Sequence, residues 1–90
     1  MRVDLFLKAS RLCPRRSVAQ QLCDAGLVLL NGAPVKSAHV VRVGDELTIR
    51  KRDKELVVRV SSVPGTRQTS RKDADTLFEL VSETPTNIDL

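Results

Sequence analysis

Basic side chains gather near the N-terminus of this 90-residue chain. Five of them fall within the first 16 residues, namely Arg2, Lys8, Arg11, Arg15 and Arg16. The guanidinium group of an arginine can donate two hydrogen bonds to one phosphate group, so this cluster favours a nucleic acid as the partner. The competing interpretation is a solvated charged surface that binds nothing. Asp4 is the only carboxylate among the first 20 residues, and we expect it to offset the charge of Arg2.

Residue types that carry enzymatic chemistry are scarce in the sequence. His39 is the only histidine, and its neighbours have the composition of a connecting loop, so we expect it on the surface. A zinc site needs about three or four ligands, which Cys13, Cys23 and His39 do not supply. Asp45 and Glu46 are adjacent, and adjacent side chains of a strand point to opposite faces. We therefore predict that the chain is not an enzyme and has no catalytic residues, no metal site and no cofactor.

Charge is unevenly distributed along the sequence. The chain has 15 Lys and Arg residues against 11 Asp and Glu residues. Residues 1–60 hold twelve of these cations and six of the carboxylates, whereas residues 61–90 hold three and five. The basic N-terminal part therefore indicates that a polyanion binds there. Aromatic residues make up only 2% of the chain, which disfavours the stacking of unpaired bases on an aromatic platform.

Several classes of protein are excluded by the sequence. No apolar run approaches the ~18 residues that a membrane helix needs, and the N-terminus lacks the pattern of a signal peptide. The two cysteines are too few for a disulfide framework, which favours a reducing compartment. We therefore expect a cytoplasmic monomer with no membrane partner.

Two helices are predicted at the start of the chain. Apolar residues recur at helical spacing over residues 2–12, and again as far as Ala25. Pro14 suits the first turn of the second helix, where its missing N–H costs nothing, and Gly26 suits the residue that ends it. The connection between these helices would bring the last three arginines of the basic cluster to one corner.

Short strands are predicted after the helices. The apolar residues 27–30 precede Asn31-Gly32, the dipeptide most typical of a two-residue hairpin, because both turn positions take positive φ. Residues 33–36 would return as the second strand. Alternating apolar residues predict two more strands, with turns before and between them: a turn at 43–45, a strand over 46–50, a turn at 53–54 and a strand through Leu56, Val58 and Val60.

The C-terminal third differs in composition. Residues 61–72 are polar and rich in turn-forming residues, so we expect a loop. Ser70 and Asp73 resemble a capping box, and the apolar residues between 74 and 81 fit a short helix. The sequence thus predicts one α+β domain, divided into a nucleic-acid-binding part over 1–62, a loop and helix packed on it over 63–82, and a flexible tail over 83–90.

Two stretches resemble a known family. The run MRVDLFLKASRL, followed by RRSVA at residues 15–19, is similar to the start of the S4-like RNA-binding domain, also called the alpha-L motif. The residues GLV at 26–28, the Asn31-Gly32 turn and VGDEL at 43–47 are similar to the hairpin and the next strand of that family. The resemblance covers about residues 1–60. It implies two N-terminal helices on a small, mainly antiparallel sheet, to which we add the short C-terminal helix.

Over its whole length the chain most resembles the small stand-alone members of this family that act in bacterial ribosome quality control. This resemblance implies binding to large ribosomal subunits obstructed by peptidyl-tRNA, where the protein steadies the P-site tRNA while a tail-adding quality-control factor extends the stalled chain. Arg2 and Arg16 match the family positions that contact the backbones of ribosomal RNA and tRNA. The candidate RNA-binding residues are Arg2, Lys8, Arg11, Arg15, Arg16, Asn31 and Lys36.

Two alternatives stay open at this point. A heat-shock-type member of the family recycles large subunits that carry nascent chains, but it has a strongly basic C-terminal extension. Residues 73–90 of this chain hold five carboxylates and no Lys or Arg, which favours the quality-control members. A protein-interaction module would instead show an exposed apolar patch beside a basic surface that nucleic acid ignores.

Overall fold

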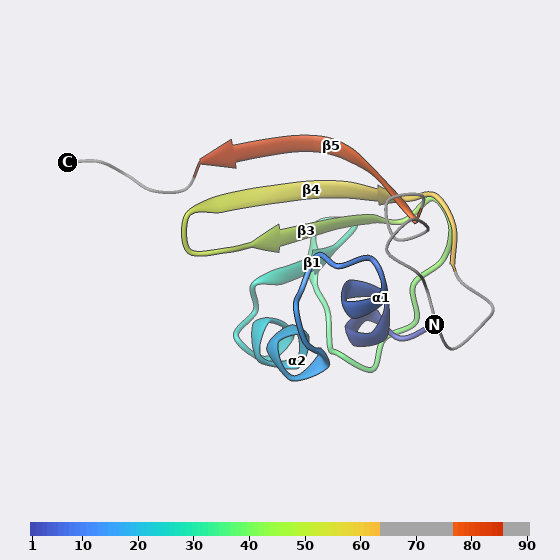
Figure 1. Cartoon of the computed structure of the whole chain (residues 1–90), viewed down its shortest axis with the longest axis horizontal. Coiled ribbons are helices and arrows are strands. Elements are labelled where there is room, and N and C mark those ends of the chain that lie inside the picture. Colours follow the sequence, from blue (N-terminus) through green and yellow to red (C-terminus); the bar gives the residue numbers. More distant parts are fainter. Residues whose placement is uncertain (64–76, 86–90) are drawn as a thin grey trace.

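Two helices lie against one face of a five-stranded antiparallel sheet (Figure 1). The computed structural model describes residues 1–63 and 77–85. Its elements are α1 (Val3–Ala9), α2 (Arg16–Asp24), β1 (Val28–Leu30), β2 (Ala33–Pro34), β3 (Glu46–Arg50), β4 (Lys54–Val60) and β5 (Phe78–Pro85), with the strands in the order β2-β1-β3-β4-β5. The predicted α+β fold, with two N-terminal helices on an antiparallel sheet, is confirmed.

The N-terminus of α1 is held by a distant segment of the chain. The N–H of Val3 donates to the carbonyl of His39 at 2.7 Å, and the N–H of Asp4 donates to the carbonyl of Ser37 at 3.2 Å. The N–H of Leu5 donates to the Asp4 carboxylate at 2.8 Å. These three bonds satisfy N–H groups that have no partner within the helix. The first turn of α1, which directly follows Arg2, is therefore fixed relative to the loop before β3.

The connection between the helices is tighter than the sequence suggests. The helix α1 ends at Ala9 rather than near residue 12, because Arg11 takes a left-handed backbone with φ 62° and the N–H of Cys13 donates back to the Leu7 carbonyl at 3.0 Å. The helix α2 then begins at Arg16, two residues after Pro14. The short connection leaves little freedom for the arginines that it carries.

The end of α2 follows the prediction. Gly26 has φ 75°, and its N–H donates to the Cys23 carbonyl at 3.0 Å, while the N–H of Leu27 donates to the Leu22 carbonyl at 2.9 Å. This pair of bonds is the Schellman arrangement that glycine favours at the residue after a helix.

The predicted hairpin is also confirmed. Asn31 and Gly32 have φ values of 50° and 88°, and they join β1 to β2 with Leu30 opposite Ala33. Both residues of the turn have positive φ, as a type I′ turn requires.

One core joins the helices to the inner face of the sheet. The strands β3 and β4 turn alternate residues toward the helices, as their sequence predicts. The largest fully buried side chains are Phe6, Leu7, Leu47, Ile49, Val3, Val28, Val41, Val58, Val60, Asp4 and Cys13. Asp4 is the one carboxylate in this set, and its partners are described below.

The predicted C-terminal helix is wrong for the residues that the structure describes. Phe78–Pro85 form β5, which pairs antiparallel with β4 from Val60↔Phe78 to Lys54↔Pro85. The apolar residues Phe78 and Leu80 also fit a period of two, and the open edge of β4 offers backbone hydrogen bonds that an isolated helical turn lacks. Pairing with β4 therefore outweighs the helical spacing.

Other predictions for the C-terminal third fall partly beyond the described residues. The greater part of the predicted loop, the capping box at Ser70 and Asp73, and residues 74–76 of the predicted helix lie outside them, as do residues 86–90. Residues 83–85, predicted to be a flexible tail, form the end of β5.

Candidate nucleic-acid interface

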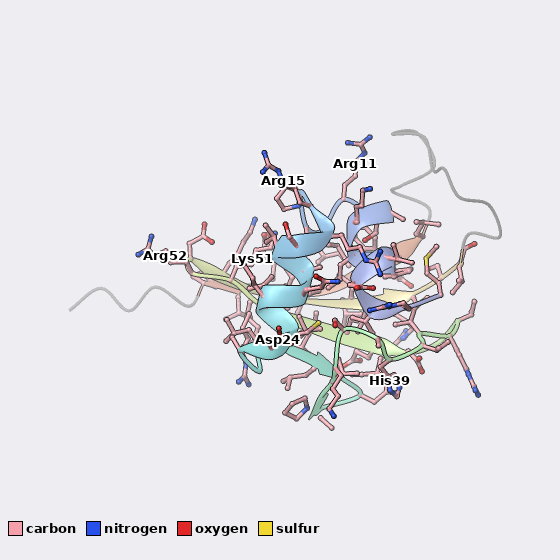
Figure 2. The ribbon with its side chains drawn as sticks, turned by 90° about the horizontal axis from the view of Figure 1, so that it is seen from below. Arg11, Arg15, Asp24, His39, Lys51 and Arg52 are labelled. Carbon is pink, nitrogen blue, oxygen red and sulfur yellow. The ribbon has the colours of Figure 1, made fainter. Side chains whose placement is uncertain are left out.

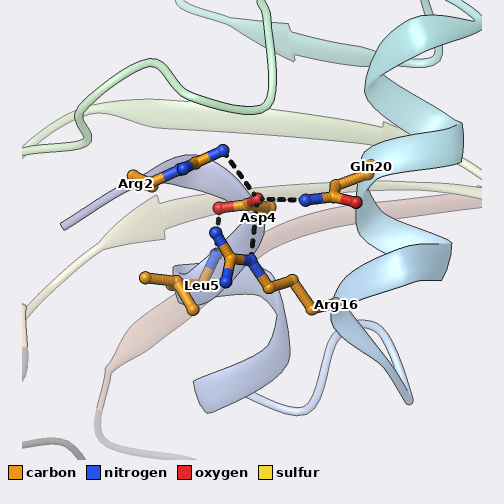
Figure 3. A network of polar contacts seen from close by, with 5 residues as sticks. All are labelled: Arg2, Asp4, Leu5, Arg16 and Gln20. Atoms are coloured by element: carbon orange, nitrogen blue, oxygen red, sulfur yellow. Dashed lines mark hydrogen bonds and ion pairs between the residues drawn. The ribbon is translucent and has the colours of Figure 1, made fainter.

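A buried carboxylate organises the N-terminal basic residues (Figure 3). Asp4 is fully buried, and its Oδ2 atom accepts hydrogen bonds from Nε of Arg16 at 3.1 Å and from Nε2 of Gln20 at 3.0 Å. The same oxygen forms an ion pair with Nη2 of Arg2 at 3.2 Å. Arg2 precedes α1, whereas Arg16 and Gln20 lie one turn apart on α2. The carboxylate therefore ties the two helices together. Asp4, expected to offset the charge of Arg2, forms an ion pair with it and also binds Arg16 and Gln20.

The Asp4 carboxylate is ionised despite its burial. Burial alone would raise its pKa, but the hydrogen bonds from Gln20, Arg16 and the Leu5 N–H, together with the charge of Arg16, outweigh burial and lower the pKa below its usual value. Two guanidinium groups thus surround one negative charge, which leaves this group of residues with a net positive charge.

Arg2 and Arg16 are each partly exposed. About two-fifths of each side chain is accessible, 40% for Arg2 and 42% for Arg16. Each guanidinium has five N–H donors in a planar fork, so one edge can bind Asp4 while another faces solvent. The Nε of Arg2 is buried and has no hydrogen-bond partner among the described residues. The arrangement suits binding of phosphate oxygens at the outer edge of the pair.

Arg11 and Arg15 extend into solvent from the connection between the helices (Figure 2). Both side chains are exposed and point away from the body of the protein at the same end. Arg11 follows α1 with a left-handed backbone, and Arg15 directly precedes α2. Lys8, in the last turn of α1, is exposed as well. The structure therefore brings the predicted corner of arginines together beside the pair on Asp4.

Asn31 and Lys36 lie outside the two helices and the connection between them. The amide of Asn31 stabilises the hairpin, since its Oδ1 accepts the N–H of Glu46 at 2.9 Å and its Nδ2 donates to Asp45 at 3.3 Å. Lys36 is exposed and directly precedes Ser37, whose carbonyl accepts the N–H of Asp4. The structure thus places Lys36 beside the start of α1 and gives Asn31 a role in the fold.

Two further residues near the basic cluster, Gln20 and Lys51, were not predicted from the sequence. Gln20 is uncharged, and only its position four residues after Arg16 signals that both lie on one face of α2. Lys51, between β3 and β4, is close enough to Cys13 for its charge to favour the thiolate of that residue. Nothing in the local sequence predicts that Lys51 approaches the connection between the helices.

Comparison with known proteins assigns the chain to a family. Residues 1–47 match the S4 domain family model. The chain is 43% identical over 94% of its length, and over 94% of the relative, to the RQC P-site tRNA stabilizing factor of Halalkalibacterium halodurans. The chain belongs to the S4 domain family. The sequence-based assignment is thereby confirmed.

Heat shock protein 15 from two organisms is also similar to this chain. Heat shock protein 15 of Escherichia coli is 29% identical over 92% of this chain, which spans 62% of that protein. The solved structure of Vibrio cholerae heat shock protein 15, described as trimeric, superposes with a TM-score of 0.80 at 26% identity. That match covers 91% of this chain and 82% of the other.

The cysteines of this S4 domain are unsuited to nucleophilic chemistry. Cys13 and Cys23 are both buried free thiols. Burial raises the pKa of Cys13, and burial together with the nearby carboxylates Asp4 and Asp24 raises the pKa of Cys23 to about 11. Both thiols are therefore protonated at neutral pH, where a nucleophile would need a thiolate.

The outer face of the sheet differs in charge from the helical side of the S4 domain. Arg59 lies between the buried Val58 and Val60, so it points away from the helices. Its cross-strand neighbours are Glu46 and Glu79. On the same face, Arg50 is paired with Glu55 at 3.2 Å. The described cations of this face thus lie beside carboxylates, whereas residues 1–26 carry five cations and two carboxylates.

Neither described helix has the length and apolar character that crossing a membrane requires.

Proposed function

We propose that this protein binds RNA on the large ribosomal subunit, without catalysing a reaction, as part of bacterial ribosome-associated quality control. The observation that carries the proposal is the pair Arg2 and Arg16, held half-exposed on a buried Asp4 within an S4 domain. The name of the Halalkalibacterium halodurans relative, RQC P-site tRNA stabilizing factor, points to the P-site tRNA as the place of binding. The similarity to that relative spans nearly the whole of both chains.

The proposed target is a large subunit obstructed by peptidyl-tRNA. The backbones of ribosomal RNA and of the P-site tRNA would be contacted by the helical side of the protein, and the bound protein would support a tail-adding factor that extends the stalled chain. The residues proposed to contact RNA are Arg2, Lys8, Arg11, Arg15, Arg16, Asn31 and Lys36. The protein acts in the cytoplasm as a monomer in this proposal.

The geometry supports backbone recognition in particular. Arg2 and Arg16 lie at the starts of the two helices and are both held by Asp4, so their guanidinium groups keep a fixed spacing. Phosphate contacts of this kind set the position and orientation of a protein on RNA without selecting a sequence. A protein that recognises one site on a ribosome can use this fixed spacing, because the ribosome fixes the spacing of its phosphates.

A heat-shock-type role in recycling large subunits is the second candidate. It is favoured by the similarity to heat shock protein 15 in sequence and in fold. The quality-control role is preferred because the chain is more similar to the tRNA stabilizing factor and covers more of it.

Crosslinking of the tagged protein in cells, followed by sequencing of the attached RNA, tests the proposal. We expect reads from a localised region of large-subunit ribosomal RNA, together with tRNA. Reads spread over messenger RNA, or an absence of crosslinked RNA, would exclude the ribosomal role. In that case a protein-interaction module would become the better explanation.

A further inference from the structure

We propose that Asp4 and Gln20 are positioning residues for RNA binding, which hold the guanidinium groups of Arg2 and Arg16 in a fixed arrangement that matches phosphates on the ribosome. The inference rests on the proposed function and specifies how its central pair of residues works. Neither Asp4 nor Gln20 needs to contact RNA itself.

The contacts converge on a single atom. Oδ2 of Asp4 accepts hydrogen bonds from Arg16 and Gln20 and forms an ion pair with Arg2, all at 3.0–3.2 Å, while Oδ1 accepts from the backbone N–H of Leu5 (Figure 3). The bond to Leu5 fixes the plane of the carboxylate relative to α1. Gln20 fixes Oδ2 from the side of α2. The two arginines therefore bind an acceptor whose position is set by both helices.

Gln20 has a special place among these donors because it carries no charge. Its amide donates to Oδ2 without adding a third cation. Gln20 therefore helps to orient the arginines through Asp4 and leaves the electrostatic attraction between the protein and RNA unchanged. The buried carboxylate is shared, which means that neither arginine can turn fully onto Asp4 and withdraw from solvent. Each side chain keeps about two-fifths of its surface exposed.

Holding the arginine side chains in place before RNA binds lowers the entropic cost of binding. A free arginine loses rotamer entropy when it is immobilised on a phosphate, whereas an arginine already fixed by a neighbour has lost much of it on folding. A substitution at Asp4 distinguishes the positioning of the arginines from simple electrostatic attraction. Asp4→Asn raises the net charge of the protein, so attraction alone predicts tighter binding to every RNA, whereas positioning predicts weaker binding to the ribosome.

Gln20→Leu is the most direct test, with Gln21→Leu as its matched control. Gln21 is the exposed neighbour on α2, and the two substitutions change composition identically. Binding is measured to large subunits carrying peptidyl-tRNA and to poly(U), each over a range of salt concentrations. We expect Gln20→Leu to weaken binding to the subunits by about threefold to tenfold, with an unchanged salt slope and unchanged affinity for poly(U). Gln21→Leu should equal the wild type on both.

A second measurement reads the arrangement without RNA. The Nε–Hε signal of Arg16 in the nuclear magnetic resonance spectrum reports its bond to Asp4. This signal should be slow in solvent exchange in the wild type and in Gln21→Leu, and faster in Gln20→Leu and in Asp4→Asn. A thermal melt confirms that each variant is folded.

Three results would overturn the inference: equal subunit affinity of Gln20→Leu and Gln21→Leu, tighter subunit binding by folded Asp4→Asn, or an Arg16 signal that Gln20→Leu leaves unchanged. Failure of the proposed function looks different, since the wild type would then show no preference for the subunits at all. In that case the Arg16 signal would still show whether Asp4 and Gln20 hold Arg16 in place.

Discussion

At the scale of single residues, Asp4 decides how the basic cluster is built. A carboxylate without accessible surface is costly unless several donors satisfy it, and Asp4 has the Leu5 N–H, two arginines and Gln20. Its ionised form is therefore favoured in the folded protein, and its pKa is lowered. The same residue that anchors the candidate RNA-binding arginines thus also contributes to stability.

The lowered pKa of Asp4 predicts a dependence of stability on pH. Because the folded-state pKa lies below the usual value of 3.8, the contribution of Asp4 to stability is fully present above pH 3.8 and is lost as pH falls through the folded-state pKa. Asp4→Asn should lower the free energy of unfolding by about 1–3 kcal/mol at neutral pH and should weaken its acid dependence. Urea denaturation of both proteins from neutral to acidic pH measures this, and parallel curves would contradict it.

Substitutions of Arg11 should affect the stability of the protein and its affinity for RNA differently. Its backbone has φ 62°, where a side chain costs about 1–2 kcal/mol and glycine is unstrained. Arg11→Gly should therefore leave the free energy of unfolding unchanged or raise it by up to about 1 kcal/mol, after the greater chain entropy of glycine is subtracted. Affinity for obstructed subunits should fall about tenfold, through the loss of one charge-assisted contact.

The matched control is Arg11→Ala, which removes the same charge but keeps a Cβ atom. It should bind RNA as weakly as Arg11→Gly and should gain no stability. Chemical denaturation and a binding titration of both variants measure these effects, and wild-type affinity in Arg11→Gly would show that Arg11 does not contact RNA.

At the scale of elements, the turn between β1 and β2 gives a clean test of the fold. Gly32 has φ 88°, and a Cβ atom added there would meet nothing within 4 Å. A substitution therefore acts through the backbone and not through a clash. Gly32→Val should lower the free energy of unfolding by roughly 1–2 kcal/mol, because a β-branched residue resists positive φ. A neutral result in a denaturation experiment would contradict the turn geometry.

Local signals predict much of this fold. Gly26 at the end of α2, the Asn31-Gly32 turn and the alternation in β3 and β4 each depend on a few neighbouring residues, so sequence suffices for them. The strand β5 could not be predicted in this way. Its spacing fits a helix or a strand, and the choice is made by the edge of β4, which is distant in sequence.

The candidate site shows the same division between local and distant information. The positive residues are visible in the sequence because charge is carried by residue type. Their anchoring is not, since the contacts of Asp4 with Arg16 and Gln20 span 12 and 16 residues and depend on how α1 packs on α2. A neutral residue such as Gln20 has no signal of its own until that packing is known.

At the scale of the whole molecule, the two sides of the sheet differ in the charge that they would present to RNA. The helical side carries the basic cluster, whereas the described cations of the outer face lie beside carboxylates. We therefore expect RNA to bind on the helical side.

This binding should depend on salt. If four to five cations each neutralise one phosphate, the logarithm of the association constant for RNA should fall against the logarithm of salt concentration with a slope of roughly −4. Affinity for structured RNA should then drop on the order of a hundredfold between about 50 and 200 mM salt, and a slope near zero in a salt titration would exclude phosphate contacts as the main attraction.

Co-sedimentation with purified large ribosomal subunits distinguishes the proposed ribosomal role from a general affinity for RNA. Wild-type protein is compared on subunits carrying peptidyl-tRNA and on vacant ones, beside Arg16→Ala and the outer-face control Arg59→Ala. We expect the wild type and Arg59→Ala to prefer the obstructed subunits. Arg16→Ala should lose much of that preference, because one charge-assisted contact contributes about 1.5–3 kcal/mol. Equal sedimentation of the wild type with vacant and obstructed subunits, or an equal loss from Arg59→Ala and Arg16→Ala, would contradict the proposed ribosomal role.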